Sequence, residues 1–289
     1  PGVTKRLGVD FETMHEINPR LIYLSISGFG QDGPLAGKPA LDTVVQAMSG
    51  IMATTGTQDA DPTRVGESVA DIITGIYGAW ALSTALYSRS VNNEGLYLDL
   101  AMFDALFTSQ VTNLSQLIAT NSAPGRIGNR HPASAPFDSF TASDGQVIIA
   151  AVTKTMFDQL CILMEQPDLS NDTRFLTETS RLQFEPELKS IIEKWTCRHS
   201  CADIIRMCEE VGIPVGPIWD IKTAAESENA RNRSLLSDIS HPVLETMQYV
   251  TQPVRFGGYR PTIKPEPELG ANNSEILDGL AQDTANLKN

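Results

Sequence analysis

The hydrophobic pattern of the chain centres on one long apolar segment, residues 66–89. From Ile72 to Ser88 this segment has no charged residue and is rich in alanine, isoleucine, leucine and glycine. Such a pattern predicts a helix that is buried on nearly all sides. At its start, Ser68 and Asp71 have the spacing of a capping box. A carboxylate where a helix N-terminus meets a hydrophobic core is ionised and partly desolvated, which suits either a helix cap or a nucleophile.

Short strands alternate with helical patterns around this segment. Residues 21–26 form a continuous apolar run typical of parallel sheets, and residues 96–100 form a second strand. Helical periodicity covers residues 4–17, 42–52 and 102–119. This alternation predicts an α/β layer with a parallel sheet, which is small because so few strands are evident.

The pattern changes after residues 123–136, a linker-like segment dense in glycine, proline and small polar residues. Residues 139–152 predict a hairpin with Asp144 and Gly145 in the turn. Helical patterns follow at residues 154–164, 185–194 and 201–211, short strands begin near residue 238, and a final helix runs from Ser274 to about Leu280. We therefore predict a separate α+β domain after the linker.

Composition narrows the classes of function. The chain has 289 residues, 41% of them hydrophobic and 20% charged, and a net charge of −13. This charge argues against nucleic acid or an anionic membrane surface as partner. The first residues show no secretory signal, so we expect a cytoplasmic protein. Residues 66–89 are about long enough to span a membrane, but Asp71 and the scattered glycine and serine favour a core helix.

Three cysteines lie close together in the second half of the chain. Cys197, Cys201 and Cys208, with His199 between the first two, raise the alternative of a zinc site. Cys201 and Cys208, however, are one heptad apart on a predicted core face of a helix. We therefore predict buried free thiols and no metal.

A glycine-rich turn follows the first strand. Residues 28–33, GFGQDG, match the G-x-G-x-x-G dinucleotide fingerprint. The match fails on context, because PLAGKP follows where the fingerprint needs a helix to hold the pyrophosphate. A nicotinamide-dependent oxidoreductase is thus a weak alternative, and a mobile glycine-rich active-site loop stays open as another interpretation.

A set of motifs in colinear order covers essentially the whole chain. These motifs are NPRLIYLSISGFGQDGP, MSGIMATTG, SVADIITG, GLYLDLAMFDA, GNRHPASAPFDSFTASDGQVIIA, VGIPVGPI and PELG. Together they resemble the family III CoA-transferases, a group that includes formyl-CoA transferase, the carnitine CoA-transferases and α-methylacyl-CoA racemase. The chain resembles a member that lacks roughly ninety residues at the front, where members carry the first strands of the sheet.

The resemblance implies an architecture. Residues 1–130 and 225–289 would form a large Rossmann-like, CoA-binding domain, and residues 131–224 would form a small α+β domain. Two subunits would be threaded through one another as an interlocked homodimer.

The resemblance also implies a chemistry. Asp71 would be the nucleophile that attacks an acyl-CoA and forms an aspartyl acyl anhydride, which the freed CoA thiolate converts to an aspartyl-CoA thioester. A small carboxylic or dicarboxylic acid would then receive the CoA through a second anhydride. CoA enters as part of the acyl-CoA substrate, and no metal is needed.

Other positions carry further implied roles. Arg6 falls where family members place an arginine near the CoA phosphates, with a solvated helix face as the alternative. Asp42 matches an active-site polar or acidic position, and a helix cap explains it equally well. Gly28 and Gly30 would line the thioester pocket, where their N–H groups approach a developing oxyanion.

Two alternatives remain within the resemblance. The racemases have a histidine directly before the residue that matches Asp42, and this chain has Leu41 there. Without that second base, racemisation lacks half of its machinery, so transfer is favoured. The other alternative is a non-catalytic truncated paralogue that binds no CoA.

Overall fold

The computed structural model of the protein describes residues 1–241, 244–259 and 263–286. The chain separates into two compact units, Pro1–Gly216 and Pro217–Asn289. The predicted α/β class is confirmed, with a two-stranded parallel sheet, a three-stranded sheet and a two-stranded antiparallel sheet. The domain boundaries near residues 130 and 224 stay a prediction.

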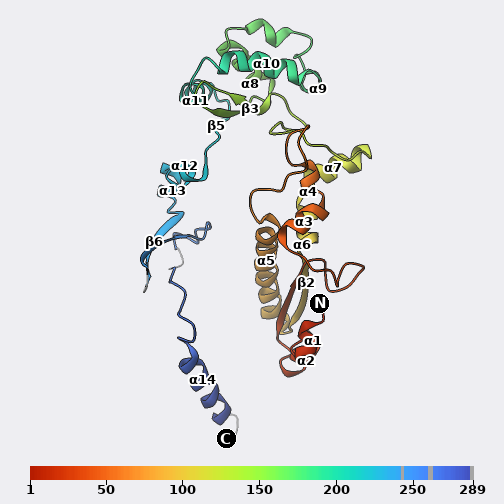
Figure 1. Cartoon of the computed structure of the whole chain (residues 1–289), viewed down its shortest axis with the longest axis vertical. Helices are drawn as coiled ribbons and strands as arrows, with labels where there is room; N and C mark the ends of the chain where they lie inside the picture. The colour runs from red at the N-terminus through yellow and green to blue at the C-terminus, as the bar shows by residue number, and fades with distance from the viewer. Residues whose placement is uncertain (242–243, 260–262, 287–289) are drawn as a thin grey trace. The chain divides into compact units, whose positions relative to one another are not determined.

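The parallel sheet consists of β1 (Ile22–Ser27) and β2 (Leu96–Ala101), which pair along their whole length. Helix α5 (Val69–Asn92) packs against both strands (Figure 1). Gly78 permits this close approach, because a Cβ there would lie 3.3 Å from Cδ2 of Leu24. Since α5 ends just before β2 begins, its first turn lies near the carboxyl ends of the two parallel strands.

The prediction that α5 is buried on nearly all sides is wrong. Its buried residues are small ones (Ala70, Thr74, Gly78 and Ala85). The large apolar side chains of one stripe are exposed: Ile72, Ile76, Trp80, Tyr87 and Val91. A uniformly apolar helix has no polar face, so its sequence does not indicate which side of the helix packs against the rest of the same chain. By length and composition α5 also qualifies as a membrane span, which is weak evidence on its own, and the absence of a membrane role stays a prediction.

The three other predicted helices of the first region are each divided in two. The bounds are α1 (Val3–Leu7) and α2 (Phe11–Ile17), α3 (Asp42–Ser49) and α4 (Ile51–Thr54), and α6 (Met102–Ser109) and α7 (Val111–Thr120). Gly8 and Gly50 separate the first two pairs with positive φ angles of 68° and 92°. Positive φ suits glycine and interrupts a right-handed helix. Gln110 lies at the third break.

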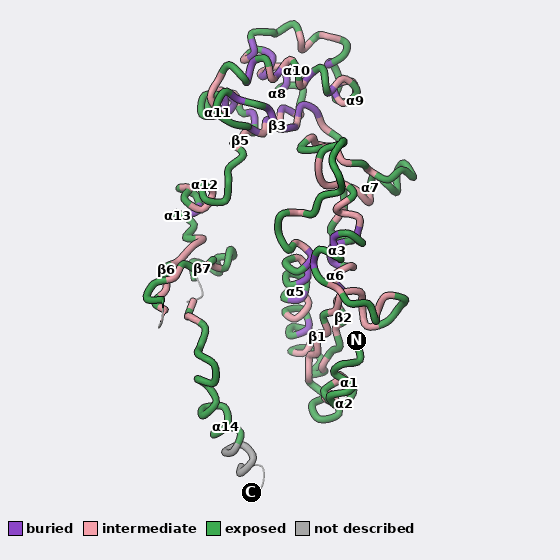
Figure 2. The backbone as a smooth tube through the Cα atoms, in the orientation of Figure 1, coloured by how far each residue is buried: buried purple, intermediate pink, exposed green. Residues whose placement is uncertain are grey.

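The α+β region from residue 137 to residue 217 has its own hydrophobic core. The predicted hairpin is confirmed as β3 (Phe137–Thr141) and β4 (Gln146–Ala150), and β5 (Val215–Pro217) joins β4. Its helices are α8 (Lys154–Leu163), the 3-10 helix η1 (Pro167–Asn171), α9 (Glu178–Gln183), α10 (Glu185–Thr196) and α11 (Cys201–Glu210). Figure 2 shows the buried segments gathered around β3, α8 and α10.

The second unit contains short elements. They are α12 (Ile221–Ala225), α13 (Glu228–Asn232), the hairpin of β6 (Leu236–His241) with β7 (Glu245–Val250), and α14 (Asn273–Asn286). The predicted final helix is confirmed and is longer than expected. The predicted strand near VRFGGY is reduced to one bridge between Phe256 and Tyr259. Residues 242–243, at the start of another predicted strand, lie outside the described residues.

The prediction of buried free thiols holds in part. All four cysteines are free, and Cys208 is buried, whereas Cys201 is half-buried and Cys197 is exposed. Cys197 is the residue that directly follows the last residue of α10. Within the described residues, no group of three or more histidine, cysteine, aspartate or glutamate side chains is arranged to hold a metal ion.

Candidate active site

Asp71 lies in the first turn of α5, two residues after the helix begins. The N-terminal dipole of this 24-residue helix favours a negative charge at that place. The predicted capping box is wrong, because Ser68 makes no side-chain cap hydrogen bond. The predicted desolvation of Asp71 is also wrong for this chain, since its side chain is exposed next to the exposed Ile72.

Asp42 caps α5 from another helix. One oxygen of its carboxylate, Oδ1, accepts a 2.8 Å hydrogen bond from the backbone N–H of Ala70, the residue before Asp71. Asp42 is the first residue of α3 and is buried. Asp42 is therefore a helix cap, as one interpretation of the sequence had it. The helix that it caps is α5 and not α3, the helix to which it belongs. Asp42 thus makes a cap bond of the kind that the sequence assigned to Ser68.

Gln46 extends the contact between α3 and the approach to α5. Its Nε2 donates to Oδ2 of Asp42 at 2.7 Å and to the carbonyl oxygen of Glu67 at 3.0 Å. Its Oε1 accepts from the backbone N–H of Val65 at 2.8 Å. Sequence reasoning missed Gln46. The available signal was its spacing, four residues after Asp42 and so on the same face of α3.

Gly28 and Gly30 lie in the turn that follows β1. A Cβ at Gly28 would overlap with the Cβ of Ala40, so close packing alone requires a glycine there. Gly30 has a φ of 92°, and its N–H donates to Oγ of Ser27 at 3.0 Å. Within the described residues 31–41 the chain forms turns and no helix, which agrees with the rejection of a dinucleotide fingerprint. The proposed place of both glycines in a thioester pocket is untested.

The glycine turn and the first turn of α5 share one small hydrophobic cluster. Its buried members are Val45, Ala70 and Leu106, and Phe29 and Val69 pack against them. Since Phe29 lies between the two glycines and Ala70 precedes Asp71, the structure brings Gly28, Gly30, Asp42 and Asp71 to the same end of the parallel sheet.

Arg6 lies at the other end of the sheet. It belongs to α1, and the backbone oxygen of Val9 just beyond α1 accepts a 2.9 Å hydrogen bond from the hydroxyl of Tyr23, near the start of β1. Figure 1 shows α1 and α2 beside the amino ends of the strands, with α3 and α6 at the opposite ends. The six residues of β1 span about 20 Å, so Arg6 and Asp71 do not contact the same part of a small ligand.

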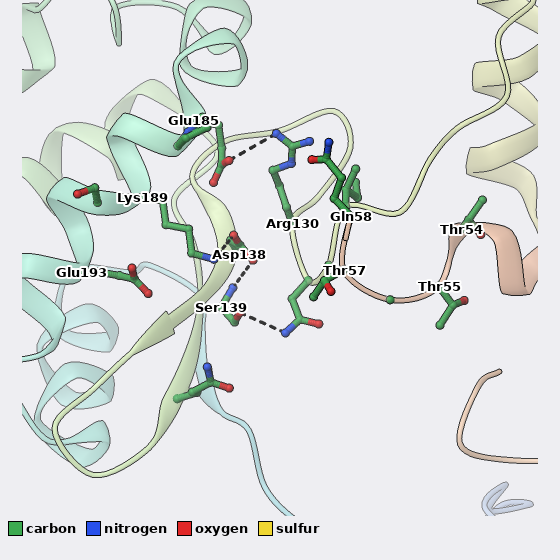
Figure 3. A pocket seen from close by; sticks show the side chains of 17 residues that line it. Thr54, Thr55, Thr57, Gln58, Arg130, Asp138, Ser139, Glu185, Lys189 and Glu193 are labelled. Atoms are coloured by element: carbon green, nitrogen blue, oxygen red, sulfur yellow. Dashed lines mark hydrogen bonds and ion pairs between the residues drawn. The ribbon is translucent and has the colours of Figure 1, made fainter. Parts of the chain in front are cut away.

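A cavity of about 830 Å³ lies next to the loop that leads toward α5 (Figure 3). Its lining includes the ATTG loop and residues from α10, and it does not include Asp71. Both cations of the lining are paired with carboxylates: Arg130 lies 3.4 Å from Glu185, and Lys189 lies 2.6 Å from Asp138. Burial raises the pKa of Glu185, and the charge of Arg130 opposes that rise. Because both cations already have carboxylate partners, the cavity is poorly suited to CoA phosphates.

Comparison with known proteins decides the family. The model of CoA-transferase family III matches residues 1–273 of the chain. The chain belongs to CoA-transferase family III. The membership expected from the motifs is therefore confirmed.

Two relatives are similar to this family III chain over most of its length. The acetyl-CoA:oxalate CoA-transferase of Acetobacter aceti is 40% identical over 90% of this chain and 66% of its own length. The succinate–glutarate CoA-transferase of Agrobacterium fabrum is 33% identical over 95% of this chain and 69% of its own length. The chain thus spans about two thirds of the length of these relatives.

Solved structures agree with the fold. A CaiB/BaiF family protein from Brucella suis is 31% identical with a TM-score of 0.81, over 96% of this chain and 73% of its own chain. The protein Rv3272 from Mycobacterium tuberculosis, at 24% identity over 95% of this chain and 74% of its own, has a TM-score of 0.85 and supports the fold alone.

Proposed function

We propose that the protein is an acyl-CoA:carboxylate CoA-transferase and that Asp71 is its nucleophile. The observation that carries this proposal is the state of Asp71: it is exposed in the first turn of α5, where the helix dipole favours its negative charge, while Asp42 caps the N–H of Ala70. The backbone of the helix thus holds this exposed carboxylate at the start of α5. The names of the family III relatives, which are enzymes that transfer CoA, support the proposal.

The proposed reaction proceeds by four acyl exchanges at Asp71. An oxygen of the carboxylate attacks the thioester carbonyl, the C–S bond breaks, and CoA leaves as the thiolate. The thiolate attacks the aspartyl carbonyl of the anhydride and releases the donor acid. The acceptor carboxylate then attacks the aspartyl-CoA thioester and releases CoA, which attacks the acceptor's carbonyl and regenerates Asp71. Positioning supplies most of the rate, because a free carboxylate is a weak nucleophile.

The substrates follow by analogy with the relatives. Their printed names indicate short acids such as oxalate, succinate and glutarate, and we propose a small mono- or dicarboxylic acid as acceptor. Arg6 would contact the phosphate-bearing end of CoA, far from the thioester, which fits its place at the opposite end of the sheet. Gly28 and Gly30 would face the thioester. Asp42 would contribute indirectly, because its hydrogen bond to the N–H of Ala70 holds the backbone directly before Asp71.

Transfer is proposed in preference to racemisation. The position before Asp42, where racemases of this family have a histidine, is Leu41, an apolar side chain with 76% of its surface exposed. A leucine neither gives nor takes a proton, so the second base of a racemase is missing at this place.

We further propose that the protein is a cytoplasmic homodimer whose two subunits are threaded through one another, as the resemblance to the family implies. We propose neither nucleic acid nor a membrane as its partner. The exposed apolar stripe of α5 supports an additional protein surface against this helix, because soluble proteins seldom leave large contiguous apolar patches uncovered.

The experiment that tests the proposal compares two carboxylates at helix starts. Asp104 also lies in the first turn of a helix, α6, and is exposed. With acetyl-, succinyl- and formyl-CoA as donors and oxalate, succinate or glutarate as acceptors, Asp71→Asn is expected to lose on the order of 10⁴-fold or more in kcat. Asp104→Asn should stay within about threefold of the parent. Equal activity of Asp71→Asn and the parent would refute the role of Asp71.

A further inference from the structure

The backbone leading to Asp71 is held by a closed hydrogen-bond relay from α3. Three backbone groups of residues 65–70 take part: the N–H of Val65, the carbonyl of Glu67 and the N–H of Ala70. On α3 the partners are the side chains of Gln46 and Asp42, which also bond to each other. The relay thus fixes the approach to α5 and the start of the helix itself at three points.

Every polar atom of the Gln46 carboxamide is used. Its Oε1 accepts from Val65, and its two N–H groups donate to Asp42 and Glu67. This set of partners fixes which end of the carboxamide is oxygen, since a backbone N–H cannot donate to an NH₂ group. Gln46 is fully buried, and buried polar groups that are fully satisfied make a rigid connection.

We infer that Gln46 is a positioning residue for Asp71. It contacts no reacting atom; it orients the backbone of residues 65–70 and the carboxylate of Asp42, which together set the direction in which α5 begins. This inference rests on the proposed covalent role of Asp71. Misplacing a reacting group by about 1 Å costs on the order of 100-fold in rate, so such a connection bears directly on the chemistry.

The chain offers a matched control for Gln46. Gln110, at the joint of α6 and α7, donates its Nε2 to the carbonyl of Ser49 at the end of α3, at 2.9 Å. It therefore bonds to the same helix as Gln46 but not to residues 65–70. Gln46→Met and Gln110→Met both keep the side-chain length and remove the carboxamide.

The test measures backbone order and chemistry separately on each variant. Hydrogen–deuterium exchange of the peptide covering residues 65–70 reports the relay. The single-turnover rate of covalent modification of Asp71 by an acyl-CoA, per active site and at saturating donor, reports the chemistry. For Gln46→Met we expect faster exchange in this peptide, a modification rate lower by on the order of 100-fold and a KM for the donor within about threefold. Gln110→Met should change neither measurement.

Each other outcome overturns a stated part of the inference. Faster exchange with an unchanged rate would show that the relay orders the backbone without positioning Asp71, and unchanged exchange would show that Gln46 does not hold it. If Asp71→Asn retains full activity, the proposed function fails, while the exchange result still decides whether the relay exists. Should Gln46→Met not fold, Asp42→Asn takes its place. This substitution places an NH₂ group against Nε2 of Gln46. We expect faster exchange in the same peptide and a modification rate lower by on the order of tenfold.

Discussion

The α+β region and the parallel-sheet region bury their apolar residues very differently. In the α+β region, phenylalanine, leucine, isoleucine and tryptophan side chains from two strands and several helices form one continuous core. In the sheet region the buried cluster has Val45, Ala70 and Leu106 as its fully enclosed members, and α5 leaves Ile76 and Trp80 each 65% exposed. Figure 2 makes the same contrast visible along the chain.

The difference indicates that the two regions are stabilised in different ways. The α+β region encloses its own core, including Arg181, whose guanidinium donates to the carbonyl oxygens of Ala135, Phe175 and Val152. The sheet region presents exposed apolar surface, which the proposed dimer would cover. The proposed nucleophile lies in this second region, where side-chain hydrogen bonds from α3, and not a large core, hold the backbone in place.

The largest expected effect on stability comes from the closed core. Ile192→Ala removes a fully buried side chain and should lower the free energy of unfolding by about 2–5 kcal/mol, measured by denaturant titration. Ile76→Ala, the same change on the exposed stripe of α5, should cost less than about 0.5 kcal/mol at high dilution. Similar losses for the two variants at high dilution would contradict the contrast.

A smaller effect is expected on self-association. Trp80 is the largest exposed apolar side chain on α5, and large aromatic residues often dominate interfaces. Trp80→Ser should weaken the proposed dimer by about 30-fold, equivalent to about 2 kcal/mol, in sedimentation experiments over a concentration series. An unchanged dimerisation constant would place the interface elsewhere.

The smallest effect concerns thiol reactivity. Burial raises the pKa of the Cys161 and Cys208 thiols to about 11. Because the thiolate is the reactive form, about one in a thousand of these thiols is ionised at pH 8, and the fraction rises about tenfold with each pH unit up to the pKa. We expect a maleimide to label the exposed Cys197 rapidly at pH 8 and to label Cys161 and Cys208 slowly, as followed by mass spectrometry. Rapid labelling of Cys208 would mean that the α+β core opens.

The sequence predicted local elements better than burial. The strands around residues 22–27 and 96–101, the hairpin with Asp144 in its turn and the principal helices could be predicted because each has a clear periodicity or turn signal. The exposure of Ile76 and Trp80 could not be predicted, because an apolar helix has the same sequence pattern whether its own chain or another surface covers it. Breaks at Gly8 and Gly50 were missed, since single glycines within a helical pattern are ambiguous.

The candidate site was predictable in its residues more than in its contacts. The resemblance pointed to Asp71 and Asp42, and the structure connects them through the N–H of Ala70. The sequence assigned the cap of α5 to Ser68, because capping rules consider neighbours along the chain and Asp42 lies 28 residues earlier. The relay through Gln46 depends on the same long-range contact.

The most direct test of the account is chemical trapping at Asp71. The protein is incubated with each acyl-CoA donor and quenched with hydroxylamine, which converts an aspartyl anhydride or an aspartyl-CoA thioester to a hydroxamate, and the modified peptides are mapped by mass spectrometry. The account predicts a hydroxamate on Asp71 with at least one donor and none on Asp104. CoA binding without any adduct on Asp71, from every donor tested, would contradict the covalent mechanism.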